Sequence, residues 1–117
     1  VVPRNHVADF VKYTKQVERD VGVRLSGFGH AGDGNLHVYV LRDDFAPETY
    51  ARKLNEAFDL LYAKARALGG QVSGEHGIGF AKKAFLAESL GEVSISLLRS
   101  IKRAFDPNGI LNPGKVC

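Results

Sequence analysis

The sequence predicts an α+β fold: a ferredoxin-like split βαβ unit with an antiparallel sheet that lacks its first strand, followed by a C-terminal helix. The first observation is that apolar residues at helical spacing alternate with short β-type runs, in the order helix, strand, strand, helix, strand, helix. That order matches a split βαβ unit without its first strand. The second observation is length, because 117 residues suffice for one compact core and not for two. We therefore expect residues 1–117 to form a single domain.

The first half of the chain predicts a helix and then a β-hairpin. Residues Asn5 to Val21 carry apolar side chains at helical spacing, with Pro3 as a start signal and Gly22 as a stop; the apolar positions are Val7, Phe10, Val11, Val17 and Val21. Two β-type runs follow, 23–29 and 36–41. Between them lies Asp33-Gly34, a strong hairpin signal, which we place at the two central positions of the turn.

The second half predicts two helices and one short strand. Pro47 opens a helix that ends at Gly69-Gly70, and its apolar face comprises Tyr50, Leu54, Ala57, Phe58, Leu61, Ala65 and Leu68. Residues Gln71 to Ser73 then predict a short strand. The sequence Ser89-Leu90-Gly91-Glu92 fits a capping box that opens a third helix, which runs to about Phe105.

Composition excludes several classes of protein. The formal charge is +3, but the basic residues are scattered and nearly matched by acidic ones, so we expect no nucleic-acid binding. We expect no transmembrane segment and no signal peptide, because the chain has neither a long charge-free apolar run nor a basic-then-apolar start. The only cysteine, Cys117, excludes an intramolecular disulfide and a four-cysteine zinc site. We expect a cytoplasmic location, with peripheral attachment to the inner membrane as the alternative.

Two histidines flank the predicted turn. With Asp33 and Gly34 at the turn centre, His30 lies directly opposite His37, and their Cβ atoms are about 4.5–5.5 Å apart on one face of the hairpin. Two imidazoles in this arrangement can share one zinc-sized ion, whose nitrogen ligands lie at about 2.0–2.1 Å. The alternative is a solvated sheet face that carries two incidental histidines.

Strand alternation separates the two faces of the hairpin. One face is apolar and predicts the core: Val23, Leu25, Leu36, Val38 and Val40. The other face is rich in polar and aromatic groups, and we interpret it as the functional face: Arg24, Ser26, Phe28, His30, His37 and Tyr39.

A second cluster, Ser73-Gly74-Glu75-His76-Gly77-Ile78-Gly79, places an acid beside an imidazole in a glycine-rich loop. If Glu75 reaches the histidine pair, the set becomes two histidines and one carboxylate, which leaves coordination positions open as in catalytic metal sites. His76 would then diverge from its neighbour and serve as a base near neutral pH. The alternative is a tight turn with a solvated Glu–His pair.

Three motifs resemble the C-terminal domain of FAD-linked oxidases, the group of glycolate oxidase FAD subunits, D-lactate dehydrogenases and D-2-hydroxyglutarate dehydrogenases in the vanillyl-alcohol oxidase superfamily. The motifs span positions 29–37, 69–79 and 106–115, and the resemblance runs essentially the whole length. It implies that the chain is a fragment, the substrate-and-metal part of a flavin enzyme about four times longer. The absence of methionine, even at position 1, agrees with that expectation.

The resemblance implies roles for individual residues. His30, His37 and Glu75 would bind a divalent metal, usually zinc, and His76 would remove the substrate's hydroxyl proton while hydride passes to FAD. Asn112, in the tail 112–115, would lie near the flavin. Tyr39 stands where the 2-hydroxyglutarate enzymes have a substrate-binding asparagine, which favours glycolate or D-lactate as the substrate type.

The missing parts imply limits on the isolated chain. FAD would be bound mainly by an N-terminal domain that these residues do not include, so we expect the fragment alone to be inactive. A sheet without its first strand exposes backbone groups, and pairing between copies would give a homodimer. Two other functions stay open: a self-standing zinc hydrolase that uses His30, His37 and Glu75, and a non-catalytic binding or assembly module.

Overall fold

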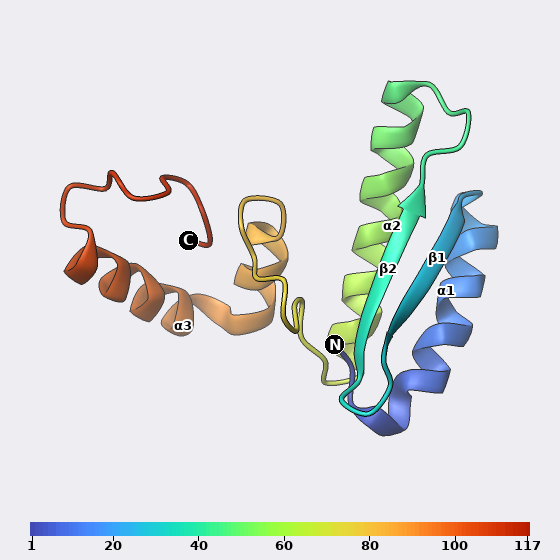
Figure 1. The fold of residues 1–117 in the computed structure, drawn as a ribbon, viewed down its shortest axis with the longest axis horizontal. Helices are drawn as coiled ribbons and strands as arrows, with labels where there is room; N and C mark the ends of the chain where they lie inside the picture. The colour runs from blue at the N-terminus through green and yellow to red at the C-terminus, as the bar shows by residue number, and fades with distance from the viewer. The chain divides into compact units, whose positions relative to one another are not determined.

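The computed structural model describes residues 1–117 and confirms the α+β class. A short 3₁₀ turn at Arg4–His6 precedes helix α1 (Val7–Val21), strands β1 (Arg24–His30) and β2 (Asn35–Leu41), helix α2 (Pro47–Ala67) and helix α3 (Lys83–Phe105). The chain divides into two compact units, residues 1–71 and 72–117. The first contains the sheet, α1 and α2, and the second contains α3 (Figure 1).

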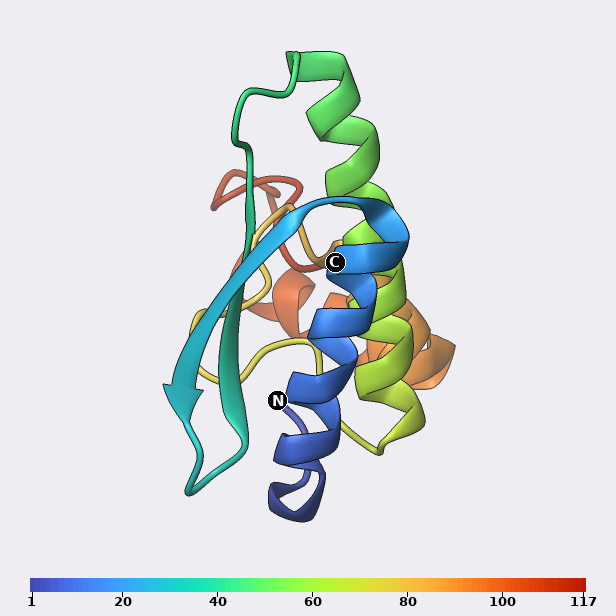
Figure 2. The ribbon, with the colours of Figure 1, turned by 90° about the vertical axis from the view of Figure 1, so that its right-hand side faces the viewer.

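In the first unit, α1 and α2 lie on one face of the β1–β2 hairpin and leave the other face uncovered by helices (Figure 2). The helices end at glycines as predicted: Gly22 follows α1 in the left-handed region, at φ +67°, and donates to Glu18 O at 3.0 Å. The core joins the apolar faces of both helices and the hairpin; its buried members are Val2, Phe10, Val17, Val21, Val23, Leu25, Val40, Ala57, Leu61 and Ala65. Val11, expected on the apolar face, is exposed, and Thr14 is buried in its place.

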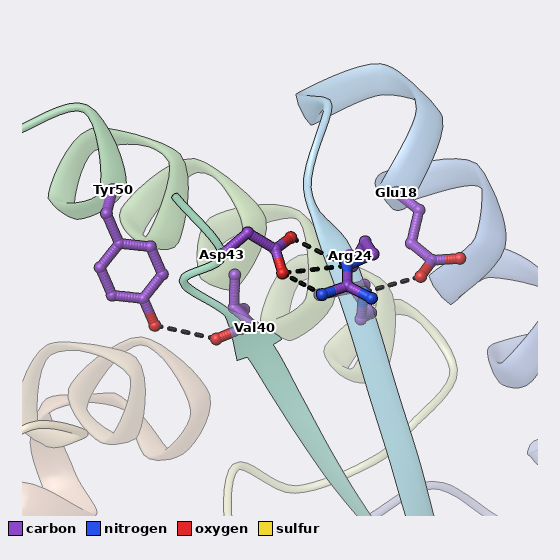
Figure 3. Close-up of polar contacts among 6 residues, drawn as sticks. Glu18, Arg24, Val40, Asp43 and Tyr50 are labelled. Carbon is purple, nitrogen blue, oxygen red and sulfur yellow. Dashed lines mark hydrogen bonds and ion pairs between the residues drawn. The ribbon is translucent and has the colours of Figure 1, made fainter. Parts of the chain in front are cut away.

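Side chains from the helices bind the backbone of both strands (Figure 3). The Leu25 N–H donates to Glu18 Oε1 at 2.7 Å, and the Tyr50 hydroxyl donates to Val40 O at 2.8 Å. Lys15 Nζ lies 2.8 Å from Glu18 Oε2, and this contact, together with the Leu25 N–H, lowers the pKa of the Glu18 carboxyl. Glu18 therefore ties the end of α1 to the start of β1.

The hairpin register differs from the prediction. His30 pairs with Asn35, and His37 pairs with Phe28, so the two histidines are not directly opposite. The connection is a four-residue loop rather than a two-residue turn, because a type I′ turn needs positive φ at both central residues and only Gly34 has it, at +74°. Asp33 instead donates its N–H to His30 O at 3.2 Å and accepts from the Asn35 N–H at 3.0 Å through Oδ1.

The predicted strand at 71–73 does not form, so the sheet has only two strands. Gln71 exchanges two backbone hydrogen bonds with Val1, both of 2.9 Å. A ladder needs a partner that runs alongside for several residues, and the N-terminal segment turns into the 3₁₀ turn at Arg4. The segment 71–73 is therefore a connection, not a third strand.

In the second unit, the helix begins earlier than predicted. It starts at Lys83 rather than at Ser89, so Ser89 does not open it. Gly91 has φ +74° and ψ 167°, which interrupts the helix two residues after the predicted cap. The glycine in the presumed capping box thus joins two helical segments, and the second segment ends at Phe105 as expected. None of the helices is both long and apolar enough to cross a lipid bilayer.

Asp106 organises the tail after α3. Its carboxylate accepts from the Ile110 N–H at 3.0 Å and the Leu111 N–H at 2.9 Å, and it pairs with the Lys102 ammonium. These groups hold the pKa of the Asp106 carboxyl below its ordinary value. The Lys102 ammonium has the largest effect, and the two N–H donors add to it. One buried carboxylate therefore stops the helix and folds the following loop back on it.

Candidate functional site

His30 and His37 lie on the same face of the hairpin, opposite to the face of the buried Leu25 and Val40. Their ring centroids are 5.7 Å apart and the rings meet edge to face at 81°. A ring nitrogen of His30 lies within 4.8 Å of one of His37. Nitrogens that share a zinc ion at about 2.0–2.1 Å are at most about 4.2 Å apart, so small side-chain rotations bring both within bonding distance. The pair therefore fits a divalent ion.

In the observed register, each residue of the hairpin lies on the face that was predicted for it. The pairing shifts by two positions relative to the expected one, and side chains alternate with a period of two, so each residue stays on its face. His30 and His37 change from direct to diagonal neighbours, which remain within reach of long or aromatic side chains. The common face was predicted correctly although the partner residues were wrong.

Two aromatic side chains extend the histidine pair into a row. Phe28 lies directly opposite His37, with ring centroids 5.1 Å apart, and it stacks on Tyr39 at 5.7 Å. Phe28 is 63% exposed and Tyr39 is 49% exposed. The structure thus places Tyr39, the expected substrate residue, two ring contacts away from His37 and three from His30. Phe28, which the alternation predicted on this face, links Tyr39 to His37.

Arg24 shares this face but already has a partner. Its Nε lies 2.9 Å from Asp43 Oδ2 and 3.0 Å from Oδ1, and a second guanidinium nitrogen also binds Oδ1 (Figure 3). The guanidinium lowers the pKa of the Asp43 carboxyl. Since both groups are solvent-accessible, the pair adds little to stability, but it engages Arg24 at the end of the hairpin away from the histidines.

Glu75 and His76 lie in a glycine-rich loop of the second unit. The Ser73 hydroxyl donates to Gly77 O at 3.1 Å and closes the loop, and Gly77 has φ +75°. Both side chains are about half exposed, and His76 Nε2 lies 3.7 Å from Glu75 Oε1. The expectation that these neighbours diverge is therefore wrong, because the turn brings carboxylate and imidazole to the same side.

Asn112 lies in a tight turn of the tail, and that tail contacts the glycine-rich loop. Asn112 has φ +45°, a conformation that asparagine tolerates better than most residues, and its carbonyl accepts from the Lys115 N–H at 3.4 Å. The Val116 N–H donates to Gly79 O at 2.8 Å, and Lys115 Nζ lies over the Phe80 ring at 5.4 Å from its centre. Within the second unit, the end of the tail thus contacts the end of the glycine-rich loop.

These features define a chain with a candidate metal-binding imidazole pair on one unit and an acid–base pair on the other. A family model described as "FAD linked oxidases, C-terminal domain" matches residues 1–116, so the chain belongs to that family. It is similar to a D-lactate dehydrogenase of Anaerostipes hadrus, with 49% identity over 117 residues that cover 100% of this chain and 25% of the relative.

Two further relatives are named for other substrates. The glycolate oxidase subunit GlcD of Bacillus subtilis is 38% identical over 98% of this chain and 24% of its own length. A D-2-hydroxyglutarate dehydrogenase of Stutzerimonas stutzeri is 33% identical over 89% of this chain and 24% of its own length. The chain therefore spans about a quarter of the length of the curated relatives it matches.

Proposed function

We propose that this chain is the substrate- and metal-binding C-terminal part of a flavin-dependent enzyme that oxidises a small D-2-hydroxy acid to the 2-oxo acid. The observation that carries the proposal is the pair of histidines on one face of the hairpin, in a chain that belongs to the FAD-linked oxidase C-terminal family. His30, His37 and Glu75 are the proposed ligands of a divalent ion, and zinc suits a set of two imidazoles and a carboxylate.

The chain's own residues then have distinct tasks. A bound ion supplies positive charge that polarises the hydroxyl or carboxylate of the substrate, and FAD, held mainly by an N-terminal domain, accepts the hydride. His76 accepts the hydroxyl proton on a ring nitrogen, which balances the loss of hydride from the same carbinol. Tyr39 would lie beside the substrate's side chain, and Asn112, in the tail, would contact the flavin.

The substrate is proposed to be of the glycolate or D-lactate type. Tyr39 presents an aromatic ring with a phenol in place of the carboxamide expected for a second carboxylate, and its ring stacks on the apolar Phe28. The names of two relatives, a D-lactate dehydrogenase and a glycolate oxidase subunit, support the same choice. A short apolar or hydrogen side chain fits next to this pair better than a carboxylate does.

Anaerobic mixing of the full-length protein that carries this segment with candidate acids tests the proposal. We expect D-lactate or glycolate to bleach the flavin absorbance faster than D-2-hydroxyglutarate does. We also expect a chelator to abolish bleaching, and stoichiometric Zn²⁺ to restore it. Failure of every 2-hydroxy acid would contradict the proposed reaction. Ester hydrolysis by the 117-residue chain with zinc would instead favour the hydrolase, and the absence of stoichiometric metal would favour the binding module.

The 117-residue chain alone is also proposed to form a homodimer. Its sheet has two strands, and side chains bind the Leu25 N–H and the Val40 carbonyl. Pairing of strand edges between copies would bind further backbone groups of these strands. Light scattering over a dilution series is expected to show a dimer that dissociates on dilution. A folded monomer at every concentration would contradict pairing through the strand edges.

A further inference from the structure

Phe28 is an apolar side chain on a face where burial gives it little stabilisation. It is 63% exposed, yet its ring makes two defined contacts, with His37 across the strand pair and with Tyr39 diagonally. The hairpin register produces both contacts, because it places Phe28 directly opposite His37. The ring therefore lies between the proposed substrate residue and one proposed metal ligand.

An imidazole binds a metal only when its ring is turned so that one nitrogen points at the ion. The second side-chain torsion of histidine is broad, so a histidine ring without close neighbours samples many orientations. His37 is half-buried and has such neighbours. The ring of His37 lies at 36° to that of Phe28 and at 81° to that of His30. The tilted Phe28 ring and the nearly perpendicular His30 ring both restrict the rotation of His37. In this orientation a nitrogen of His37 lies within 4.8 Å of one of His30.

We propose that Phe28 is a positioning residue for His37: its ring holds the imidazole in the orientation that lets His30 and His37 share one ion. Phe28 also links Tyr39 to His37, since its ring contacts the rings of both residues. This inference rests on the proposed metal site, but it concerns the orientation of His37, which can be measured without metal.

Substitution of Phe28 in the 117-residue chain tests the inference with two readouts. Titration calorimetry with Zn²⁺ measures affinity, and side-chain coupling constants and ring-to-ring nuclear Overhauser effects measure the rotamers of His37 in the metal-free chain. Phe28→Ala is expected to weaken Zn²⁺ binding about three- to tenfold. It is also expected to let His37 exchange among several rotamers, so that its coupling constants become averages over them. Phe28→Tyr keeps an aromatic ring at this position and is expected to restore both. Phe105→Ala, which removes a similarly exposed phenylalanine at the end of α3, is expected to change neither.

The outcomes separate the two proposals. If the wild-type chain binds no Zn²⁺ while Phe28→Ala still averages the His37 rotamers, the proposed metal site fails and the positioning role stands. If Phe28→Ala leaves the His37 rotamers unchanged, or if Phe28→Tyr behaves like Phe28→Ala in both readouts, the positioning role is overturned whatever the wild-type affinity.

Discussion

Replacing His76 with alanine in the full-length protein is expected to lower turnover by about 10²- to 10⁴-fold, the usual contribution of a general base, while the bound metal stays near its normal stoichiometry. The physical reason is the proposed division of roles between neighbours in the glycine-rich loop: Glu75 offers a carboxylate to the ion, and His76 accepts the proton. Stopped-flow flavin reduction measures the rate, and elemental analysis of the same sample measures the metal.

The matched substitutions are His30→Ala and His37→Ala, which remove the proposed ligands. Each is expected to lose metal and activity together, because a site of two imidazoles and one carboxylate binds weakly with one imidazole missing. Equal loss of metal in all three variants would contradict the roles assigned here. The 3.7 Å separation of His76 Nε2 and Glu75 Oε1 makes this test necessary, since it puts His76 near enough to the carboxylate to compete for the ion.

The helices of the first unit could be predicted from the sequence, because their signals are local. Apolar spacing, Pro47 at the start of α2 and glycines after both helices each act within a few residues of the element that they define. The faces of the hairpin were equally predictable, since side-chain alternation depends only on whether a position is odd or even. Membership of the FAD-linked oxidase C-terminal family, suggested by three motifs, was confirmed by a match over residues 1–116.

The register could not be predicted because a distant segment helps to determine it. Asp33-Gly34 favours a two-residue turn when the flanking strands alone are considered. In the folded unit the Val2 N–H donates to Gly34 O at 3.0 Å, and Val2 is buried in the core. The N-terminal segment therefore packs against the loop, which takes four residues. The contact of Phe28 with His37 follows from that register, so it could not be predicted from the sequence either.

The errors in the second unit have a different origin. Ser89-Leu90-Gly91-Glu92 carries the residue types of a capping box, but the preceding residues have good helix propensity and the helix begins at Lys83. Gly91 marks the break instead, because its φ of +74° is accessible to glycine at little cost. The local sequence thus predicted a helix boundary within two residues of the actual break. It predicted the start of a helix, whereas the structure has an interruption between two helical segments.

Gly34→Ala is expected to destabilise the first unit by about 2–4 kcal/mol, through a left-handed backbone and a steric clash. Gly34 has φ +74°, and a Cβ there would lie 1.9 Å from the Val2 carbonyl oxygen, so the N-terminal segment must move and the Val2–Gly34 hydrogen bond is lost. Gly32→Ala is the control in the same loop, because a Cβ at that position has no atom within 4 Å. Hydrogen exchange of core amides in α1 and β1 measures both variants. Equal protection in Gly34→Ala and Gly32→Ala would show that the N-terminal segment does not hold the loop, and that the register of the histidine face has another cause.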